Sequence, residues 1–73
     1  MGNEQHFTPQ AERRWSALGG VIQTRLLNDV WCGDCHKTTT IVNFSGKIER
    51  GDLVLEGHCI NCNGSVARVI EGA

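Results

Sequence analysis

The N-terminal part of the chain carries an apolar stripe at helical spacing. The stripe consists of Ala11, Trp15, Leu18, Ile22 and Leu26. Thr8-Pro9 precedes it, and a hydroxyl N-cap followed by proline at the first helical position is a typical helix start. Two interior glycines cost about 2 kcal/mol relative to alanines. We therefore expect a helix that ends near Leu18 with Gly19 as its C-terminal cap, whereas residues 21–27 fit either a further helical turn or a strand.

From Trp31 onward the pattern changes to runs rich in β-branched residues. The runs cover residues 38–44, 53–58 and 65–71, with turn signals at Ser45-Gly46, Gly51-Asp52 and Asn63-Gly64. Such runs between glycine-containing turns are typical of short strands. The sequence therefore predicts three antiparallel strands after an N-terminal α-helix.

These patterns divide the chain into three segments. We expect a disordered polar tail at 1–7, a helical segment at 8–28 and a small β domain at 29–73. The longest apolar stretch, 17–22, is interrupted by two glycines and is too short to cross a bilayer. The N-terminus lacks the apolar region of a secretory signal. We expect a soluble cytoplasmic chain that does not associate with membranes.

Length and charge narrow the possibilities further. A chain of 73 residues forms a single domain whose hydrophobic core is marginal without a disulfide or a metal. Seven Lys and Arg residues balance eight Asp and Glu residues, for a net charge of −1. The chain as a whole therefore does not attract nucleic acid, and such a partner would need a local basic patch.

Four cysteines supply the missing reinforcement. Cys32 and Cys35 form one Cys-x2-Cys pair, Cys59 and Cys62 form another, and residues 36–58 separate the pairs. Two residues between thiols let a tight turn aim both sulfurs at one point, and two such turns complete a tetrahedral zinc site. The separation equals one strand out and one strand back, so a single Zn²⁺ bound by all four thiolates would close a β-hairpin.

Residues 31–36, Trp-Cys-Gly-Asp-Cys-His, also fit two other motifs. They resemble the redox motif of thioredoxins and the attachment signature of c-type haem. A thioredoxin needs a larger βαβ-containing fold with the cysteines at a helix start, and haem attachment needs export and an unpaired motif. A framework of two disulfides conflicts with a reducing cytoplasm. A shared metal site is therefore the favoured interpretation.

His36 and His58 lie next to the cysteine pairs on the outside. Either imidazole could replace a thiolate or donate a hydrogen bond to one. Because four thiols already complete the site, we expect both histidines to be solvated neighbours.

The last 45 residues or so resemble a zinc ribbon, a fold in which two cysteine knuckles sit on β-hairpins. The resemblance implies that Cys32, Cys35, Cys59 and Cys62 are the metal ligands. Residues 30–35 (VWCGDC) and 40–44 (TIVNF) are most similar to the C-terminal ribbon of CHY-RING ubiquitin ligases. The chain has no RING or CHY segment, so the resemblance does not imply ligase activity.

Two other kinds of ribbon fit less well. Rubredoxins have Cys-Pro-x-Cys-Gly knuckles and aromatic cores, whereas His36 and Asn63 follow the knuckles here and the chain lacks tyrosine. An iron-binding, rubredoxin-like electron carrier is therefore a lesser alternative. Ribbons of the S-II transcription elongation factors present adjacent Asp and Glu residues at a hairpin tip, whereas here Arg50-Gly51 separates Glu49 from Asp52.

The expected function is binding to another protein. A closed tetrathiolate site has no coordination position for a substrate, and no nucleophile and base are paired elsewhere, so we expect no catalysis. The helical stripe, with Trp15, Leu18 and Ile22, is the candidate partner-binding face. In the other interpretation, Trp15 docks the helix on the ribbon and Trp31 covers the metal site.

Nucleic-acid binding is the alternative from a second class. Its candidate residues are Lys37, Lys47, Arg50 and Arg68. These cations are interleaved with carboxylates, and a zinc bound by four thiolates adds negative charge, so a mixed solvated surface is favoured.

Overall fold

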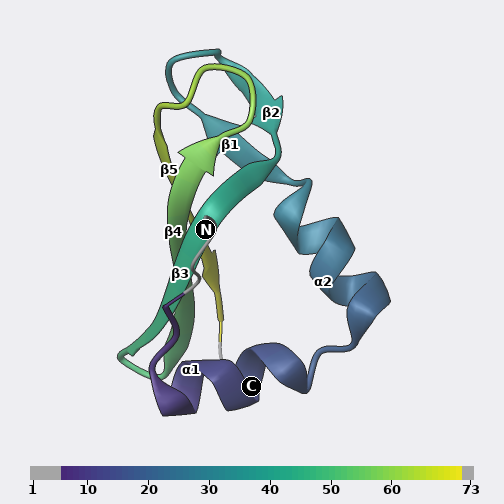
Figure 1. The fold of residues 1–73 in the computed structure, drawn as a ribbon, viewed down its shortest axis with the longest axis vertical. Helices are drawn as coiled ribbons and strands as arrows, with labels where there is room; N and C mark the ends of the chain where they lie inside the picture. Colours follow the sequence, from purple (N-terminus) through teal and green to yellow (C-terminus); the bar gives the residue numbers. More distant parts are fainter. Residues whose placement is uncertain (1–5, 72–73) are drawn as a thin grey trace.

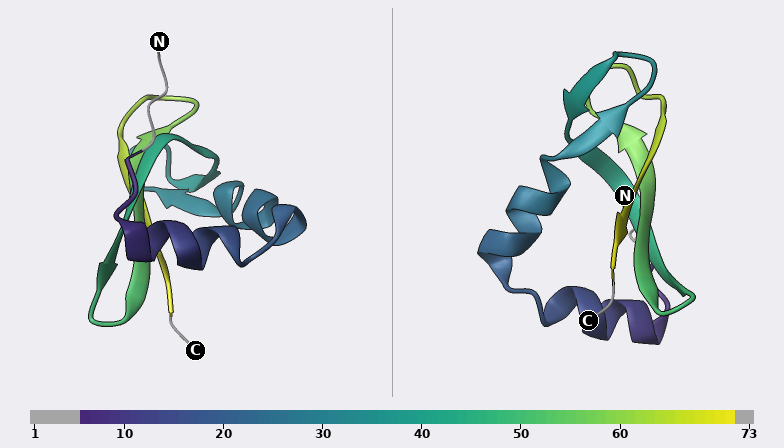
Figure 2. Two further views of the ribbon diagram at one scale, coloured as in Figure 1. Left: turned by 60° about the horizontal axis from the view of Figure 1, so that its bottom comes forward. Right: turned by 180° about the vertical axis from the view of Figure 1, so that it is seen from behind.

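The computed structural model describes residues 6–71, in which two short helices precede two small antiparallel sheets (Figure 1). The elements are α1 (Pro9–Ser16), α2 (Gly20–Leu27), β1 (Val30–Cys32), β2 (Lys37–Thr39), β3 (Ile41–Glu49), β4 (Asp52–Cys59) and β5 (Ser65–Ile70). α1 lies across one end of the larger sheet, and α2 leads from there to the β1–β2 hairpin at the other end (Figures 1 and 2). Within the described residues, neither eight-residue helix is long enough to cross a membrane.

The strands form two sheets, so the prediction of one three-stranded ribbon was wrong in this respect. β1 pairs with β2, and β3, β4 and β5 form an antiparallel sheet in that order. The predicted strand 38–44 is divided at Thr40. There the hydroxyl donates to Oδ1 of Asn28 at 2.7 Å and the carbonyl accepts from Ile60 N at 3.0 Å. These bonds connect the chain to the loops instead of to a neighbouring strand, which lets it pass from one sheet to the next.

The turn predicted at Ser45-Gly46 is also wrong, because β3 continues to Glu49. The turn lies at Arg50-Gly51, where both residues have positive φ (54° and 84°), as in type I′ hairpins. Gly46 has another role. Its backbone bonds to His6 O and Thr8 N at 3.0 and 3.1 Å, and a Cβ atom at Gly46 would lie 2.5 Å from the ring of Phe7.

Phe7 therefore belongs to the fold, although it falls within the predicted polar tail at 1–7. It forms a parallel bridge to Gly46, and its ring lies 6.0 Å from Phe44 and 6.3 Å from Trp15. Trp15 and Phe44 are themselves 6.0 Å apart and near perpendicular. Edge-to-face aromatic contacts of this kind add to the hydrophobic burial. This aromatic cluster joins the N-terminal segment and α1 to β3; residues 1–5 of the predicted tail lie outside the described residues.

The helical segment begins as predicted and then divides in two. The Thr8 hydroxyl caps α1 by accepting from Ala11 N at 3.2 Å. Ala17 is the C-cap, and Gly19, the predicted cap of the first helix, is instead the N-cap of α2 with φ of 83°. Residues 21–27, which the sequence left open, are helical. The positive φ at Gly19 turns the chain between the helices.

The core lies between the larger sheet, α1 and β1. It comprises Ala11, Val30, Cys32, Ile41, Phe44, Leu53, Leu55, Cys59 and Val66. Two of the metal-site cysteines are therefore part of the hydrophobic core. A small core of this kind supports the expectation that the fold needs reinforcement.

A β-bulge bends β3 near the end that pairs with Cys59. The pairing with β4 shifts between Val42 and Ser45, and Asn43 within the bulge has φ of 53°. Gly57 faces this bulge, where a Cβ atom would lie 2.7 Å from Val42 O and 2.9 Å from the Phe44 Cα. A side chain at this position would have to displace backbone, so only glycine fits without rearrangement.

Gly57→Ala should therefore destabilise the metal-loaded protein by about 1–3 kcal/mol, the usual cost of overpacking. Denaturant unfolding in excess zinc measures this change. Gly20→Ala is the matched control, because a Cβ atom there meets nothing within 4 Å and alanine favours the helix. Equal stability of the two variants would contradict the close approach at the bulge.

Candidate metal centre

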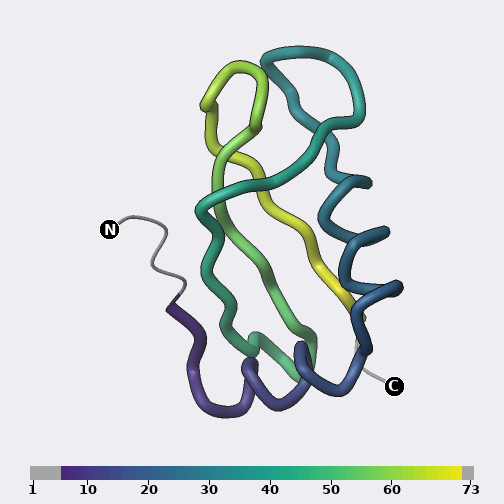
Figure 3. Tube along the Cα trace, turned by 45° about the vertical axis from the view of Figure 1, so that its right-hand side comes forward, coloured from purple at the N-terminus to yellow at the C-terminus, as the bar shows by residue number. Residues whose placement is uncertain are grey.

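Two hairpin loops at the same end of the molecule carry the four cysteines. Cys32 ends β1 and Cys35 lies in the turn toward β2, whereas Cys59 ends β4 and Cys62 lies in the turn toward β5. Figure 3 shows the two loops side by side at the end opposite α1. The antiparallel hairpins therefore bring together two pairs that are far apart in the sequence.

The four sulfurs have the spacing of a tetrahedral metal site. Sγ of Cys32 lies 3.6 Å from Sγ of Cys62, Sγ of Cys35 lies 3.9 Å from Sγ of Cys59, and all four lie within 4.8 Å of one another. Four sulfurs each about 2.3 Å from a central ion are about 3.8 Å apart. No two are near the bonding distance of a disulfide, about 2.05 Å, and all four cysteines are free. The geometry fits a metal ion bound by four thiolates.

Backbone N–H groups point at the sulfurs within each loop. The N–H of Cys35 donates to Cys32 Sγ at 3.4 Å, and that of Asn61 donates to Cys59 Sγ at 3.3 Å. The N–H of Gly64 donates to Cys62 Sγ at 3.4 Å. Such bonds stabilise the charged form of a thiol and reduce the charge accumulated on four thiolates.

The two loops close in the same way. The N–H of His36 donates to Cys32 O and that of Asn63 donates to Cys59 O, both at 2.8 Å. His36 and Asn63 both have left-handed backbones, with φ of 57° and 64°, a conformation in which asparagine and histidine are enriched among non-glycine residues. His36 is thus a closing residue of the loop. Among the described residues, neither His36 nor His58 is part of the ligand cluster.

The site is half enclosed. Cys32 and Cys59 are each 1 % exposed, Cys35 is partly buried and Cys62 is exposed. Cys32 and Cys59 belong to the hydrophobic core, and Cys35 packs against it. An ion held by these four sulfurs would have all four tetrahedral positions filled by protein.

Thr39 and Asn61 form a polar link between the loops. The Thr39 hydroxyl lies 3.2 Å from Cys59 Sγ, and Nδ2 of Asn61 donates to Thr39 Oγ1 at 3.2 Å. Because the hydroxyl oxygen already accepts from Asn61, its hydrogen is free to point at the sulfur. Thr39 is 5 % exposed and is the buried polar residue of the described core.

These contacts give the cysteine thiols different pKa values. The Thr39 hydroxyl, with help from backbone N–H groups and against the effect of burial, lowers the pKa of Cys59 to about 6. The bond to the Cys62 sulfur, together with burial and the other cysteines, raises the pKa of Cys35 to about 12. At neutral pH Cys59 is therefore already a thiolate, whereas a metal must displace the proton of Cys35.

The residues of the predicted partner-binding stripe do not stay together. Trp15 packs on the aromatic cluster, Leu18 is partly buried and Ile22 is 45 % exposed on α2. Trp31 is 61 % exposed, and the burial of its neighbours alternates with it along β1. It therefore lies on the face of β1 opposite Cys32 and does not cover the site.

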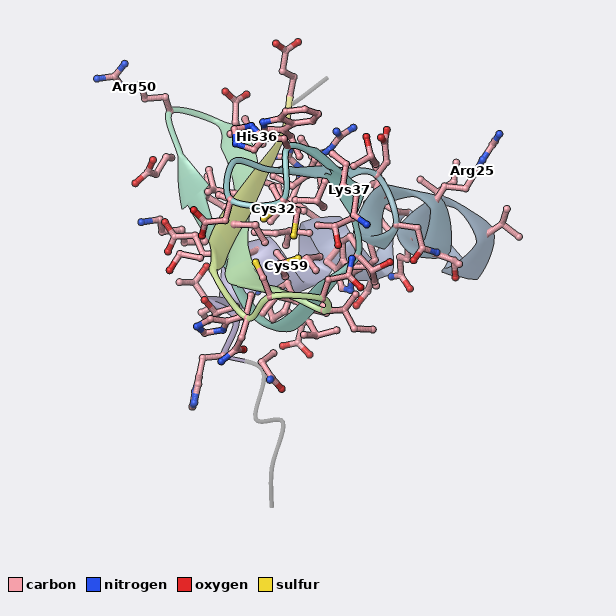
Figure 4. The ribbon with its side chains drawn as sticks, turned by 90° about the horizontal axis from the view of Figure 1, so that it is seen from above. Arg25, Cys32, His36, Lys37, Arg50 and Cys59 are labelled. Carbon is pink, nitrogen blue, oxygen red and sulfur yellow. The ribbon has the colours of Figure 1, made fainter. Side chains whose placement is uncertain are left out.

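The four predicted cations do not form one face. Lys47 pairs with Glu49 at 3.1 Å and Glu56 at 3.6 Å. Arg68 lies 3.8 Å from a carboxylate oxygen of Asp29. The other two are widely separated, with Lys37 beside the first loop and Arg50 at the far hairpin tip (Figure 4).

Sequence reasoning missed the role of Thr39 and Asn61. Thr39 is one of three consecutive threonines, and its neighbours Thr38 and Thr40 are exposed and partly buried respectively. No local pattern distinguishes the threonine that faces the sulfur. Asn61 lies between two cysteines, where its backbone role follows from the knuckle but its side-chain contact does not.

Comparisons with protein families, curated protein sequences and solved structures gave no significant match. The assignment of the site therefore rests on the cysteine geometry, which is that of a zinc-ribbon-like metal centre.

Thr39→Val should lower zinc affinity about tenfold, the low end of the range for residues that support ligands. Without the hydroxyl, the pKa of Cys59 rises toward its ordinary value, so zinc must displace an additional proton at neutral pH. The loss of affinity should therefore be smallest above about pH 9 and widen as the pH falls toward 6. Competition with a chromophoric chelator across this range measures it.

Thr38→Val is the matched control, because Thr38 is exposed on the same strand. Its zinc affinity should follow that of the unmodified chain at every pH. A Thr39→Val affinity indistinguishable from that of Thr38→Val would refute the role of the hydroxyl.

Proposed function

We propose that this chain is a small zinc protein in which a structural tetrathiolate ion supports a protein-binding module. The observation that carries the proposal is the convergence of four sulfurs, from two separate loops, within 4.8 Å. Four protein ligands leave no open position for a substrate or an activated water, so the proposed ion stabilises structure and does not catalyse.

Zinc is proposed over iron because zinc commonly fills four-thiolate sites of this spacing in structural ribbons. A tetrahedral set of four sulfurs also suits iron. The loops here close with His36 and Asn63 where the rubredoxin pattern has glycine, which argues against the electron-carrier alternative. Purified protein distinguishes the two directly, because a ferric tetrathiolate is red and zinc is colourless.

The proposed structural role follows from where the two sheets meet, because the four cysteines lie at that junction. Ile60 N donates to Thr40 O at 3.0 Å, and an Arg68 guanidinium nitrogen donates to Asp29 O at 3.0 Å. β1 also packs against β5. An ion that takes two ligands from each hairpin would add a direct link between the β1–β2 hairpin and the larger sheet.

The proposed binding role rests on the apolar side chains left at the surface. They are Val21, Ile22, Trp31, Ile60 and Val69, each 45–75 % exposed. Single exposed apolar residues are ordinary, but a chain of this size has few to spare from its core. Trp31, Ile60 and Val69 lie on three different segments, namely β1, the second loop and β5. Val21 and Ile22 are adjacent on α2, which is therefore the element with two such residues.

Removal of zinc should unfold the metal end of the protein. Zinc in structural sites contributes on the order of 10 kcal/mol to folding, so a chelator should collapse the dispersed amide resonances of β1, β2 and both loops, and added zinc should restore them. We also expect elemental analysis to find one zinc per chain.

Two variants make the test specific to the thiolates. Cys62→Ser should lose zinc, whereas His36→Asn should keep it, because asparagine tolerates the left-handed backbone and the imidazole is not a ligand. A chelated protein with an unchanged spectrum would refute the structural role, and red protein would favour iron.

A further inference from the structure

α2 is poorly enclosed for a helix of its composition. Four of its eight residues are aliphatic, namely Val21, Ile22, Leu26 and Leu27, and none of the eight is buried. A helix of this length is unstable alone in water and depends on tertiary packing of its apolar residues. A helix that is apolar on several sides is normally covered on those sides. The exposure of α2 therefore calls for a physical explanation.

The inner side of α2 accounts for only part of its apolar surface. Gln23 Nε2 donates to Trp15 O at 2.7 Å, which ties α2 to α1, and Leu27 packs against the core. Leu26 is also partly buried. The outer side remains open, with Val21 75 % and Ile22 45 % exposed. Figure 2 shows the N-terminal end of α2 standing away from the larger sheet.

The open side combines aliphatic groups with one cation. A shallow, mainly apolar hollow of about 620 Å³ is lined by Gly20, Val21, Thr24 and Arg25. Arg25 follows Val21 by four residues and Ile22 by three, so it adjoins both on the helix surface. Its side chain extends outward at the side of the molecule, away from the labelled cysteines (Figure 4).

Arg25 is the charged residue of α2 itself. Residues 13–28 contain no Asp or Glu, and Glu12 and Asp29 flank this range. The Arg14 guanidinium donates to Gly51 O at 2.8 Å, so its side chain is directed at the β3–β4 hairpin. Arg13 and Arg25 are exposed. The open side of α2 therefore combines aliphatic groups with the cation of Arg25, which favours an apolar ligand that carries a carboxylate.

We propose that the outer side of α2 docks an acidic peptide segment of another protein. The ligand would place an aliphatic side chain against Val21 and Ile22 and a carboxylate on the guanidinium of Arg25. This inference rests on the proposed binding function and names its site and the chemistry of its partner. Burial of the two aliphatic residues supplies affinity, and Arg25 supplies the preference for acidic over basic segments.

Two other occupants fit the surface less well. A second copy of the chain in a symmetric contact would bring the Arg25 side chains of both copies together, and α2 alone offers far less than the ~800 Å² per partner of a standard interface. A membrane surface would receive only two exposed aliphatic residues from α2, Val21 and Ile22, which is little for an interfacial helix.

Selection from a random peptide library tests the proposal. The zinc-loaded full chain is immobilised and panned, and the enriched peptides should carry Asp or Glu next to aliphatic residues. The affinity of one enriched peptide, made by synthesis, is then measured by fluorescence anisotropy. Val21→Gln should weaken binding at least about tenfold, as expected for a central apolar contact, and Arg25→Glu should shift the selection toward basic peptides.

Val69→Gln is the matched control, because Val69 is an aliphatic residue 54 % exposed on β5, outside α2. It should leave binding unchanged. Enriched peptides whose binding depends on Val69 and not on Val21 would overturn the α2 site but leave the proposed binding role in place. Absence of any enriched peptide would overturn both the site and the binding role. Binding to phosphatidylserine vesicles that requires Val21, or Val21-dependent dimers in sedimentation, would reassign α2.

Discussion

The convergence of four thiols is the constraint on which the rest of the structure depends. Cys32 and Cys59 belong both to the metal site and to the hydrophobic core, so binding and packing stabilise the same residues. A core of this size leaves little excess stability. The proposed ion would therefore stabilise this chain of 73 residues by fixing the ends of two hairpins to each other, whereas a larger protein gains that stability from a larger hydrophobic core.

This arrangement also explains why the helices can be loosely attached. α1 packs on β3 through Trp15 and the aromatic cluster, at the end of the molecule farthest from the thiols. α2 bridges the two ends and contributes no buried residue. If the metal and the aromatic cluster fix the two ends, then the helix between them is free to serve as a surface instead of as part of the core.

The cysteine cluster and two strands of the larger sheet follow from the sequence because their signals are local. Cys-x2-Cys spacing sets the geometry of each loop, and the β-branched runs 53–58 and 65–71 correspond to β4 and β5. The features that the sequence did not reveal depend on contacts between distant residues. The contact of Phe7 with Gly46, the change of sheet at Thr40 and the hydroxyl of Thr39 near Cys59 all join segments that no periodicity relates. A run of three threonines predicts one continuous strand, and the sequence does not show that Thr40 bonds to residues outside the sheets.

X-ray absorption at the zinc edge of the loaded protein tests the central claim most directly, because it counts the ligand atoms. We predict four sulfurs at about 2.3 Å and no nitrogen at about 2.0 Å. A shell of three sulfurs and one nitrogen would show that a histidine replaces a thiolate. Two or fewer sulfurs would contradict the shared tetrathiolate site and the role of the metal in joining the two hairpins.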